Sequence, residues 1–365
     1  MKLLFFINSM RGGGAERVMA VLTDELTKRG HEITLVVMSS YPSYYKLNKD
    51  VKLIQFDNRV NNSLFGKIKY KLKSYFFIRQ KIKKINPDVV IPFMYSLITP
   101  VLISSLFLNI PVIASEHTTF DKEMSFWLRF KRFYINRLAD KVTVLTQYDY
   151  NYIGTRLKNK IVMPNPLSFE PIRESNEKRK KYIIAAGSVD RYHIKGFDNL
   201  IKIWGEIAKQ YPQWKLHIAG GGSEDYMTKL YNLANDDNVS NQFELLGQVK
   251  NLDERFRESS IFVLSSRYEG FGMVLIEAMS QGCACISFDC TAGPREIINN
   301  NVDGILVEDQ NMDDMTLALS DLIENEDKRE RLATEAIKSV DRFSVKNITD
   351  KWERLLVDVV DIKAD

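Results

Sequence analysis

Cysteine and histidine are scarce in this sequence, which excludes two common kinds of structural framework. The only cysteines, Cys283, Cys285 and Cys290, fall within one apolar stretch and its exit. They are too few and too close together for a set of disulfides, so a reducing cytoplasm fits best. The four histidines are scattered along the chain, and no second cysteine pair is present to complete a zinc site. We therefore expect three buried thiols and no metal centre there.

A membrane-spanning helix is not expected either. Residues 89–115 contain no charge over 27 positions, a length that is sufficient to cross a bilayer. Pro92, Pro100 and Pro111 interrupt any regular helix in this segment. The apolar run at residues 2–9 is too short for a signal peptide.

A large excess of charge is also absent. The chain has 51 basic and 47 acidic residues, and its net charge of +4 does not by itself indicate a nucleic-acid partner. At 365 residues, of which 45% are apolar and 27% charged, the composition predicts a globular protein with two domains.

Short apolar runs alternate with helical patterns through both halves, which is typical of parallel α/β folds. The strands expected in the first half are 2–8, 32–38, 51–55, 89–92, 111–114 and 141–145, and the helices include 15–29 and 100–108. The strands expected in the second half are 182–186, 214–219, 243–246, 261–264, 284–288 and 305–307. We predict two doubly wound, Rossmann-like domains, 1–167 and 168–344, followed by a helix in 345–365.

The segment 265–279 carries most of the chemical information. Gly270 and Gly272 permit a tight turn between a strand and a helix, which places Glu269 on a loop and Glu277 in the first turns of the helix. Such a turn presents N–H groups to a diphosphate, and a carboxylate beside it can accept hydrogen bonds from both hydroxyls of a ribose. For two isolated glutamates, an amphipathic helix with solvated side chains is the simpler interpretation.

The complete motif resembles the retaining glycosyltransferases of family 4, which have the two-domain GT-B architecture. The likeness covers nearly the whole chain, and its elements occur in the family's order: Gly13 to Glu16, Glu116-His117, Asn165-Pro166, Lys195-Gly196, Glu269 to Gly282, and Gly293 to Glu296. The resemblance implies that the domains face one another across a cleft. It also implies that the first domain serves the acceptor, that the second binds a nucleotide sugar, and that the last helix returns to the first domain.

The resemblance assigns the donor site to the second domain. Lys195 resembles the lysine that neutralises the donor diphosphate and the charge left on it when the glycosidic bond breaks. Where the family carries an arginine, this sequence has Ser188, and we expect Arg191 to supply the missing cation. The alternatives are that Lys195 acts alone or that Arg191 is a surface residue. The remaining donor-binding residues expected here are Gly270, Phe271, Gly272, Met273 and Glu277.

A glycine turn follows the first strand. The amides of Gly13 and Gly14 are expected to line the site of a phosphate or the acceptor. Arg17 stands where a dinucleotide-binding fingerprint has glycine, so the spacing is wrong for an NAD site. A tight turn without a ligand is the alternative.

His117, Glu269 and Lys195 are the expected catalytic residues. His117 is expected beside the reacting sugar, as a hydrogen-bond partner or through its backbone carbonyl and not as a general base; a structural histidine is the alternative. Glu269 could be assigned the nucleophile of a retaining hydrolase, but the resemblance implies that it binds sugar hydroxyls while a phosphate oxygen takes the acceptor's proton. No Asp-x-Asp motif follows a strand, so we expect neither a metal nor another cofactor.

Residues 59–84 contain nine basic residues, no acidic residue and several aromatic ones, and 126–137 repeats this pattern. Such a surface suits anionic lipid, although a solvated amphipathic helix is a nearly equal alternative. A nucleic-acid groove is disfavoured, because stacking platforms normally lie on sheets.

Together these features predict a hexosyltransferase of the retaining kind. It would move a hexose or N-acetylhexosamine from a nucleotide diphosphate sugar, with UDP as the first choice, to a glycan linked to a lipid diphosphate. The expected location is the cytoplasm or the inner face of the plasma membrane, in surface polysaccharide synthesis. A UDP-sugar epimerase of GT-B architecture and a catalytically silent nucleotide-sugar-binding protein are the alternatives.

Overall fold

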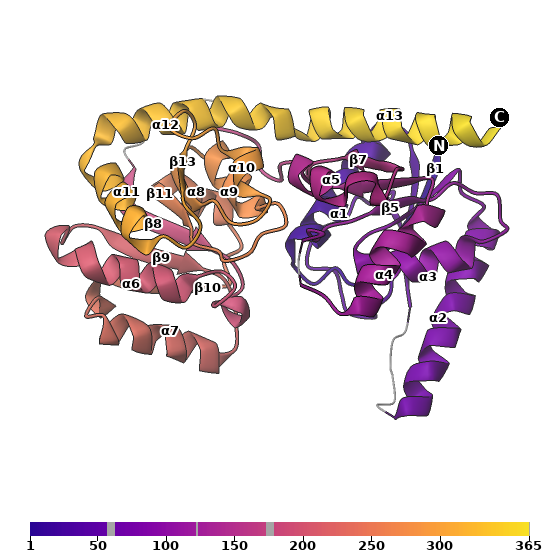
Figure 1. The fold of residues 1–365 in the computed structure, drawn as a ribbon, viewed down its shortest axis with the longest axis horizontal. Coiled ribbons are helices and arrows are strands. Elements are labelled where there is room, and N and C mark those ends of the chain that lie inside the picture. Colours follow the sequence, from indigo (N-terminus) through magenta and orange to yellow (C-terminus); the bar gives the residue numbers. More distant parts are fainter. Residues whose placement is uncertain (57–62, 122, 173–178, 365) are drawn as a thin grey trace. The chain divides into compact units, whose positions relative to one another are not determined.

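The computed structural model describes residues 1–56, 63–121, 123–172 and 179–364. The chain divides into two compact units, each with its own parallel sheet and its own core (Figure 1). Unit 1 consists of Met1–Ser168 and Phe343–Asp365, and unit 2 consists of Phe169–Arg342.

Unit 1 is built on parallel strands in the order β3-β2-β1-β4, continued by β5-β6-β7. Their bounds are β1 (Lys2–Ile7), β2 (Glu32–Val37), β3 (Lys52–Gln55), β4 (Val89–Pro92), β5 (Ile113–Ser115), β6 (Lys141–Val144) and β7 (Lys160–Val162). Parallel bridges from Val90 to Val112 and from Phe93 to Ser115 connect β4 with β5. The strand β7 was not predicted, because it has three half-buried residues at the edge of the sheet and no apolar run to mark it.

Helices cover this sheet and connect its strands in the way that parallel pairing requires. They are α1 (Gly14–Lys28), α2 (Leu64–Ile85), α3 (Tyr95–Ser105), α4 (Phe126–Tyr134), α5 (Gln147–Ile153) and the terminal α13 (Val345–Ala364). The prediction of a helix over 100–108 was wrong in its bounds, because Pro100 lies inside α3 rather than at its start. The missing N–H of a proline removes one helical hydrogen bond, and burial of Leu97, Val101 and Leu102 holds the helix together.

None of the described helices combines the length and the apolar composition that a bilayer crossing needs.

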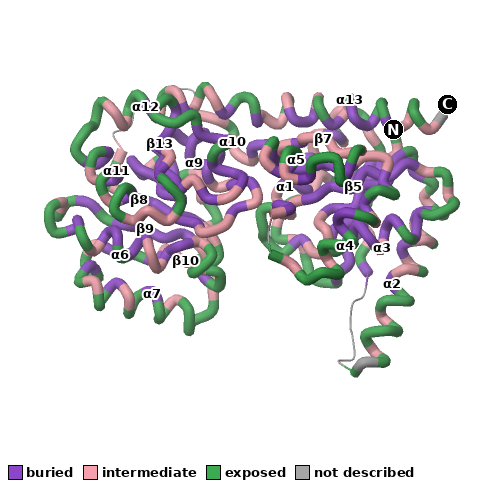
Figure 2. The backbone as a smooth tube through the Cα atoms, in the orientation of Figure 1, coloured by how far each residue is buried: buried purple, intermediate pink, exposed green. Residues whose placement is uncertain are grey.

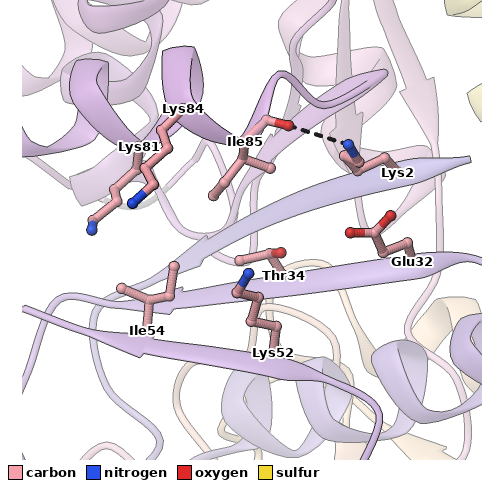
Figure 3. A pocket seen from close by; sticks show the side chains of 8 residues that line it. All are labelled: Lys2, Glu32, Thr34, Lys52, Ile54, Lys81, Lys84 and Ile85. Atoms are coloured by element: carbon pink, nitrogen blue, oxygen red, sulfur yellow. Dashed lines mark hydrogen bonds between the residues drawn. The ribbon is translucent and has the colours of Figure 1, made fainter.

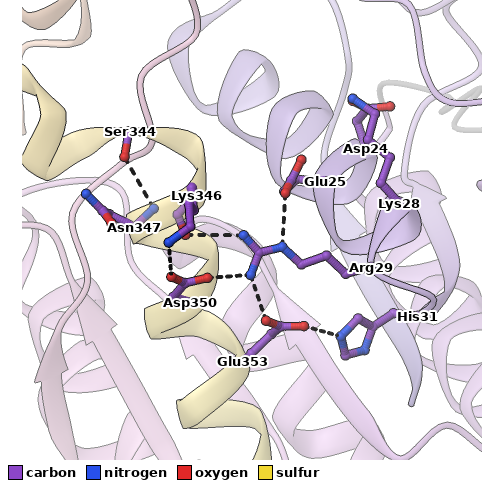
Figure 4. Close-up of polar contacts among 10 residues, drawn as sticks. All are labelled: Asp24, Glu25, Lys28, Arg29, His31, Ser344, Lys346, Asn347, Asp350 and Glu353. Atoms are coloured by element: carbon purple, nitrogen blue, oxygen red, sulfur yellow. Dashed lines mark hydrogen bonds and ion pairs between the residues drawn. The ribbon is translucent and has the colours of Figure 1, made fainter.

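The terminal helix α13 packs on the rest of unit 1 through both charged and apolar contacts, and Figure 4 shows the polar ones. Arg29, at the end of α1, donates hydrogen bonds to Asp350 at 2.5 Å and to Glu353 at 2.7 Å. The Nε2 atom of His31 lies 2.9 Å from Glu353. Buried apolar residues of α13, including Trp352, complete the contact.

Unit 2 contains six parallel strands in the order β10-β9-β8-β11-β12-β13. Their bounds are β8 (Lys180–Ala186), β9 (Lys215–Ala219), β10 (Phe243–Gly247), β11 (Ser259–Leu264), β12 (Ala284–Phe288) and β13 (Ile305–Val307). The helices are α6 (Phe197–Ile207), α7 (Glu224–Asp236), α8 (Leu252–Glu258), α9 (Met273–Ser280), α10 (Pro294–Ile297), α11 (Met312–Glu324) and α12 (Glu326–Ser339). The order reverses between β8 and β11, which makes the carboxyl ends of these two strands the expected ligand site of a doubly wound sheet. The predicted α/β class with two Rossmann-like sheets is confirmed.

Candidate active site

Lys195 and Glu269 meet at the switch point of the unit 2 sheet. Lys195 follows β8, and Glu269 follows the neighbouring strand β11. The Nζ atom of Lys195 donates to Oε1 of Glu269 at 2.7 Å, and the hydroxyl of Ser266 donates to the same oxygen at 2.7 Å. Both charged side chains are largely enclosed, with 15% and 10% of their surface exposed. The structure thus brings together two of the three predicted catalytic residues. Sequence reasoning missed Ser266, which lies three residues before Glu269 on the same loop.

Close backbone packing fixes the loop that carries Lys195. Gly196 has a φ of 65°, and a Cβ on it would lie 1.8 Å from the carbonyl oxygen of Ser265. The Ser265 hydroxyl donates to the carbonyl oxygen of Lys195 at 2.9 Å, and the amide of Arg267 donates to the carbonyl of Ile194 at 2.9 Å. The family-like Lys-Gly pair is therefore explained: only glycine permits the two loops to approach so closely.

The glycine motif before α9 adopts the turn that the spacing predicted. Gly272, with a φ of 100°, precedes the first residue of α9, Met273. Phe271 is buried, and its carbonyl oxygen packs closely against Gly293. A Cβ at position 293 would lie 1.9 Å from that oxygen, so only glycine fits there. Glu277 lies in the second turn of α9 and is buried, whereas Glu269 lies on the loop, next to Gly270.

Arg191 lies close in sequence to Lys195 but is positioned differently. It ends a single turn of 3-10 helix, Val189–Arg191, and its side chain is exposed. Its carbonyl oxygen accepts a hydrogen bond from the amide of Lys195 at 2.9 Å, and in the described part of the chain no carboxylate forms an ion pair with its guanidinium. Ser188 is also exposed, at the start of the same turn. The structure therefore leaves Arg191 as a solvent-facing cation beside the lysine loop.

The glycine turn of unit 1 is exposed to solvent, but side chains of the same unit lie against it. Gly13 precedes α1, and a Cβ on it would lie 2.3 Å from a carboxylate oxygen of Glu16. The ring of Tyr44 packs against Gly12, and the hydroxyl of Tyr45 donates to the carbonyl oxygen of Gly13 at 3.2 Å. A ligand at the amides of Gly13 and Gly14 would therefore meet the carboxylate of Glu16, a feature that sequence reasoning missed.

His117 follows β5 in unit 1, with its ring held on an aromatic stack. The ring lies 4.4 Å from that of Phe93 between centroids, at 24°, and Phe93 in turn stacks on Trp352 of α13 at 6.4 Å and 17°. The Nε2 atom lies 3.1 Å from the hydroxyl of Ser115. Burial lowers the pKa of His117 to about 3, so the ring is neutral at physiological pH, as is required for a group that acts by hydrogen bonding and not as a cation.

A buried ion pair holds the loop that carries His117. Arg132 of α4 donates from Nε and Nη2 to the two carboxylate oxygens of Glu116, both at 3.1 Å. Its Nη1 atom also donates to the carbonyl oxygen of Thr119 at 2.9 Å, while Asp149 accepts from the amide of Phe120 at 2.7 Å. Glu116 is therefore engaged within the protein. Arg132 belongs to the segment 126–137 that the sequence marked as a basic surface, but it is buried and pairs with Glu116. The partners of the stack come from elements distant in the chain and carried no sequence signal.

The cysteines are buried as free thiols. Burial raises the pKa of the Cys283 thiol to about 12. Among the described residues no group of histidine, cysteine and carboxylate side chains has the arrangement of a metal site.

A separate cavity of about 250 Å³ lies at the opposite, amino-terminal edge of the unit 1 sheet (Figure 3). It is lined by the first residues of three strands and the end of α2: Lys2, Glu32, Thr34, Lys52, Ile54, Lys81, Lys84 and Ile85. Gly13, Gly14 and His117 all follow the carboxyl ends of strands in this unit, so the cavity is distinct from them.

Both units match known family models. The model described as Glycosyl transferases group 1 matches residues 168–339, and the model described as Glycosyltransferase Family 4 matches residues 12–167. The amylovoran biosynthesis glycosyltransferase AmsD of Erwinia amylovora is 31% identical over 97% of this chain and 99% of its own length.

Two further similarities extend over nearly the full length. A Campylobacter jejuni relative, named as an alpha-1,4-N-acetyl-D-galactosaminyltransferase for a glycan on diNAcBac-PP-undecaprenol, is 26% identical over 98% of this chain and 99% of its own. The solved structure of Anabaena HepE in complex with UDP and glucose has a TM-score of 0.82 at 18% identity, and covers 98% of this chain and 99% of that chain. This last likeness concerns the fold.

Proposed function

Because the chain belongs to the glycosyltransferases of group 1 and family 4, we propose that it is a retaining enzyme that transfers a hexose or N-acetylhexosamine from a UDP-sugar to a glycan. Its fold is GT-B, and its relatives include bacterial glycosyltransferases of polysaccharide biosynthesis. The choice of UDP is supported by the ligand of the HepE structure.

One observation carries the proposal. Lys195 donates a hydrogen bond to Glu269 at the topological switch point of the doubly wound unit 2 sheet, which is where such sheets bind nucleotides. In the proposed complex Lys195 turns to the donor diphosphate, Glu269 accepts hydrogen bonds from the sugar hydroxyls, and Glu277 accepts those of the ribose. The amides from Gly270 to Met273 face the phosphates.

Transfer then breaks the bond between the anomeric carbon and the phosphate oxygen and forms a bond from that carbon to the acceptor oxygen. The acceptor's proton passes to the departing phosphate, on the same face of the sugar, and Lys195 stabilises the charge that develops there. His117, neutral and fixed by its stack, donates or accepts a hydrogen bond at the donor sugar. Lys195 and Arg191 supply the positive charge in this scheme, so we expect activity to persist in EDTA without any cofactor.

For the acceptor we propose a glycan on a lipid diphosphate, at the cytoplasmic face of the plasma membrane. The proposal is supported by the name of the Campylobacter relative, which specifies a PP-undecaprenol acceptor.

The test is a thermal-shift panel of UDP-, GDP- and ADP-sugars, followed by transfer kinetics. A ligand stabilises the native state in proportion to its saturation, so we expect the UDP-sugar to raise the melting temperature most. Glu277→Ala should lower donor affinity or turnover at least about tenfold, because each charge-assisted hydrogen bond contributes about 1.5–3 kcal/mol. The control is Glu224→Ala, at an exposed position of α7. Unchanged kinetics in Glu277→Ala would refute the assignment of this residue, and release of an epimerised UDP-sugar without acceptor would refute the transfer reaction.

A further inference from the structure

Helix α2 has two apolar faces, only one of which the fold uses. Ile78 and Ile82 are buried in the core of unit 1, and Tyr70 and Phe77 pack on it beside Phe56. These residues lie on one side of the helix, as the period of 3.6 requires. This side packs α2 on the core of unit 1.

The opposite face carries a second apolar row, which points into solvent. Phe65, Ile68, Leu72 and Phe76 follow one another at spacings of three and four residues, so they form one stripe along the helix. Phe65, Leu72 and Phe76 are 85%, 67% and 72% exposed, and Figure 2 shows this part of α2 as mostly exposed. Large apolar side chains gathered in this way mark an interaction surface.

The stripe continues onto the turn after α3. Arg79, one turn beyond Phe76, donates hydrogen bonds to the carbonyl oxygens of Ser104 at 2.8 Å and Leu106 at 2.9 Å. The next residue, Phe107, has a φ of 64° and is 97% exposed. An apolar tip is therefore fixed beside the end of the stripe by hydrogen bonds to α2.

The charges around the stripe all have one sign. Lys69 and Lys73 border it on one side, Lys71 lies further round on the other, and Lys67 lies towards the side that packs on the core. All four are exposed, and α2 contains no acidic residue. Long lysine side chains can extend away from an apolar row and place their ammonium groups in a polar layer above it. Arg59, the first basic residue of the predicted lipid-binding segment, lies outside the described residues.

We propose that this stripe, with the Phe107 tip, is a membrane-contact surface that lies in the headgroup region of a bilayer rich in anionic lipid. The apolar row enters the boundary between headgroups and acyl chains, and the lysines contact the lipid phosphates. Charge complementarity selects this occupant: a second copy of the chain seated on the same stripe would bring its own Lys69 and Lys73 against these two lysines. The inference deepens the proposed function, and rests on it, in that it names the surface through which the enzyme reaches a lipid-linked acceptor.

The test is co-sedimentation of the full chain with vesicles of phosphatidylcholine, with and without phosphatidylglycerol. We expect binding only to the anionic vesicles, weakened by high salt. Lys69→Gln with Lys73→Gln should lower the partition coefficient about fivefold for each lysine. Phe65→Ser with Leu72→Ser should lower it at least about tenfold. All four positions are exposed, so the melting temperature should not change.

A matched control carries Val302→Ser with Leu317→Ser, two exposed apolar residues of unit 2, and should bind vesicles as the wild type does. Equal binding by all variants, or no binding by the wild type at low salt, would overturn the proposal. A concentration-dependent dimer that is lost in Phe65→Ser with Leu72→Ser, without vesicle binding, would overturn it too and assign the stripe to a second copy.

The same preparations separate this inference from the proposed function. A protein that binds the anionic vesicles but no nucleotide sugar would refute the transferase assignment and leave the surface intact. A protein that is stabilised by a UDP-sugar but binds no vesicles would refute the surface alone.

Discussion

Replacement of Lys195 by methionine separates two roles that the lysine combines. The lysine side chain packs against Gly187, where a Cβ on the glycine would lie 3.1 Å from its Cδ and Cε atoms. Methionine keeps this apolar contact and removes the ammonium group. Among the described residues, the hydrogen bond that Glu269 then retains is that from the Ser266 hydroxyl at 2.7 Å, and its carboxylate stays largely enclosed. Breaking a buried pair by removing one partner costs about 3–5 kcal/mol, and the residual exposure of 10–15% places this pair at the lower end, about 3 kcal/mol. We expect this loss in urea unfolding of unit 2.

The same change should weaken UDP binding, since a charge-assisted hydrogen bond to the diphosphate contributes about 1.5–3 kcal/mol, or about ten- to a hundredfold in Kd. Calorimetric titration with uridine, which lacks the phosphates, should show no change. Adding Glu269→Gln should restore most of the stability of Lys195→Met, because no unpaired charge then remains, but should not restore the affinity for UDP.

Lys180→Met is the matched control, because Lys180 pairs with Glu258 at 3.0 Å on the surface of the same unit and such pairs contribute little. An unchanged Kd for UDP in Lys195→Met would refute the role of the lysine at the diphosphate. Equal stability of Lys195→Met and the wild type would refute the reasoning about the buried pair.

Two further changes test unit 1. Burial lowers the pKa of His117 to about 3, whereas its value in the unfolded chain is about 6.5. Between these two values the unfolded state binds one more proton than the folded state, so the free energy of unfolding falls as pH falls. At pH 5 the loss is about 2 kcal/mol relative to pH 7.5. His117→Phe should remove this part of the pH dependence in urea unfolding, and identical slopes for both proteins between pH 7.5 and 5 would contradict the burial argument. Arg29→Met should lower the free energy of unfolding by about 1–2 kcal/mol, since it removes charge-assisted hydrogen bonds to α13 that are partly exposed to solvent. The control is Lys351→Met, at an exposed position of α13. Equal losses of stability in the two variants would argue against a specific contact of Arg29.

Local pattern determined the secondary structure and the family of this protein from sequence alone. Apolar runs flanked by glycine turns predicted nearly all strands, because a strand buried on both faces of a parallel sheet must be apolar throughout. The turn around Gly272 and the positions of Glu269 on a loop and Glu277 on a helix also followed from local spacing. The exceptions were local as well: β7 is too short to show a pattern, and α3 accommodates Pro100 in its interior.

Only the tertiary structure decided what each charged group contacts. The pairing of Lys195 with Glu269 joins positions 74 residues apart, and the stack from Trp352 through Phe93 to His117 joins three distant elements. Such partners depend on strand order and on loop packing, which a single sequence does not display. The sequence marked 59–84 as a candidate lipid surface but did not show which of its apolar residues face outward. Phe65 and Phe77 look alike in sequence, and only the packing of α2 shows that the first is exposed and the second is covered.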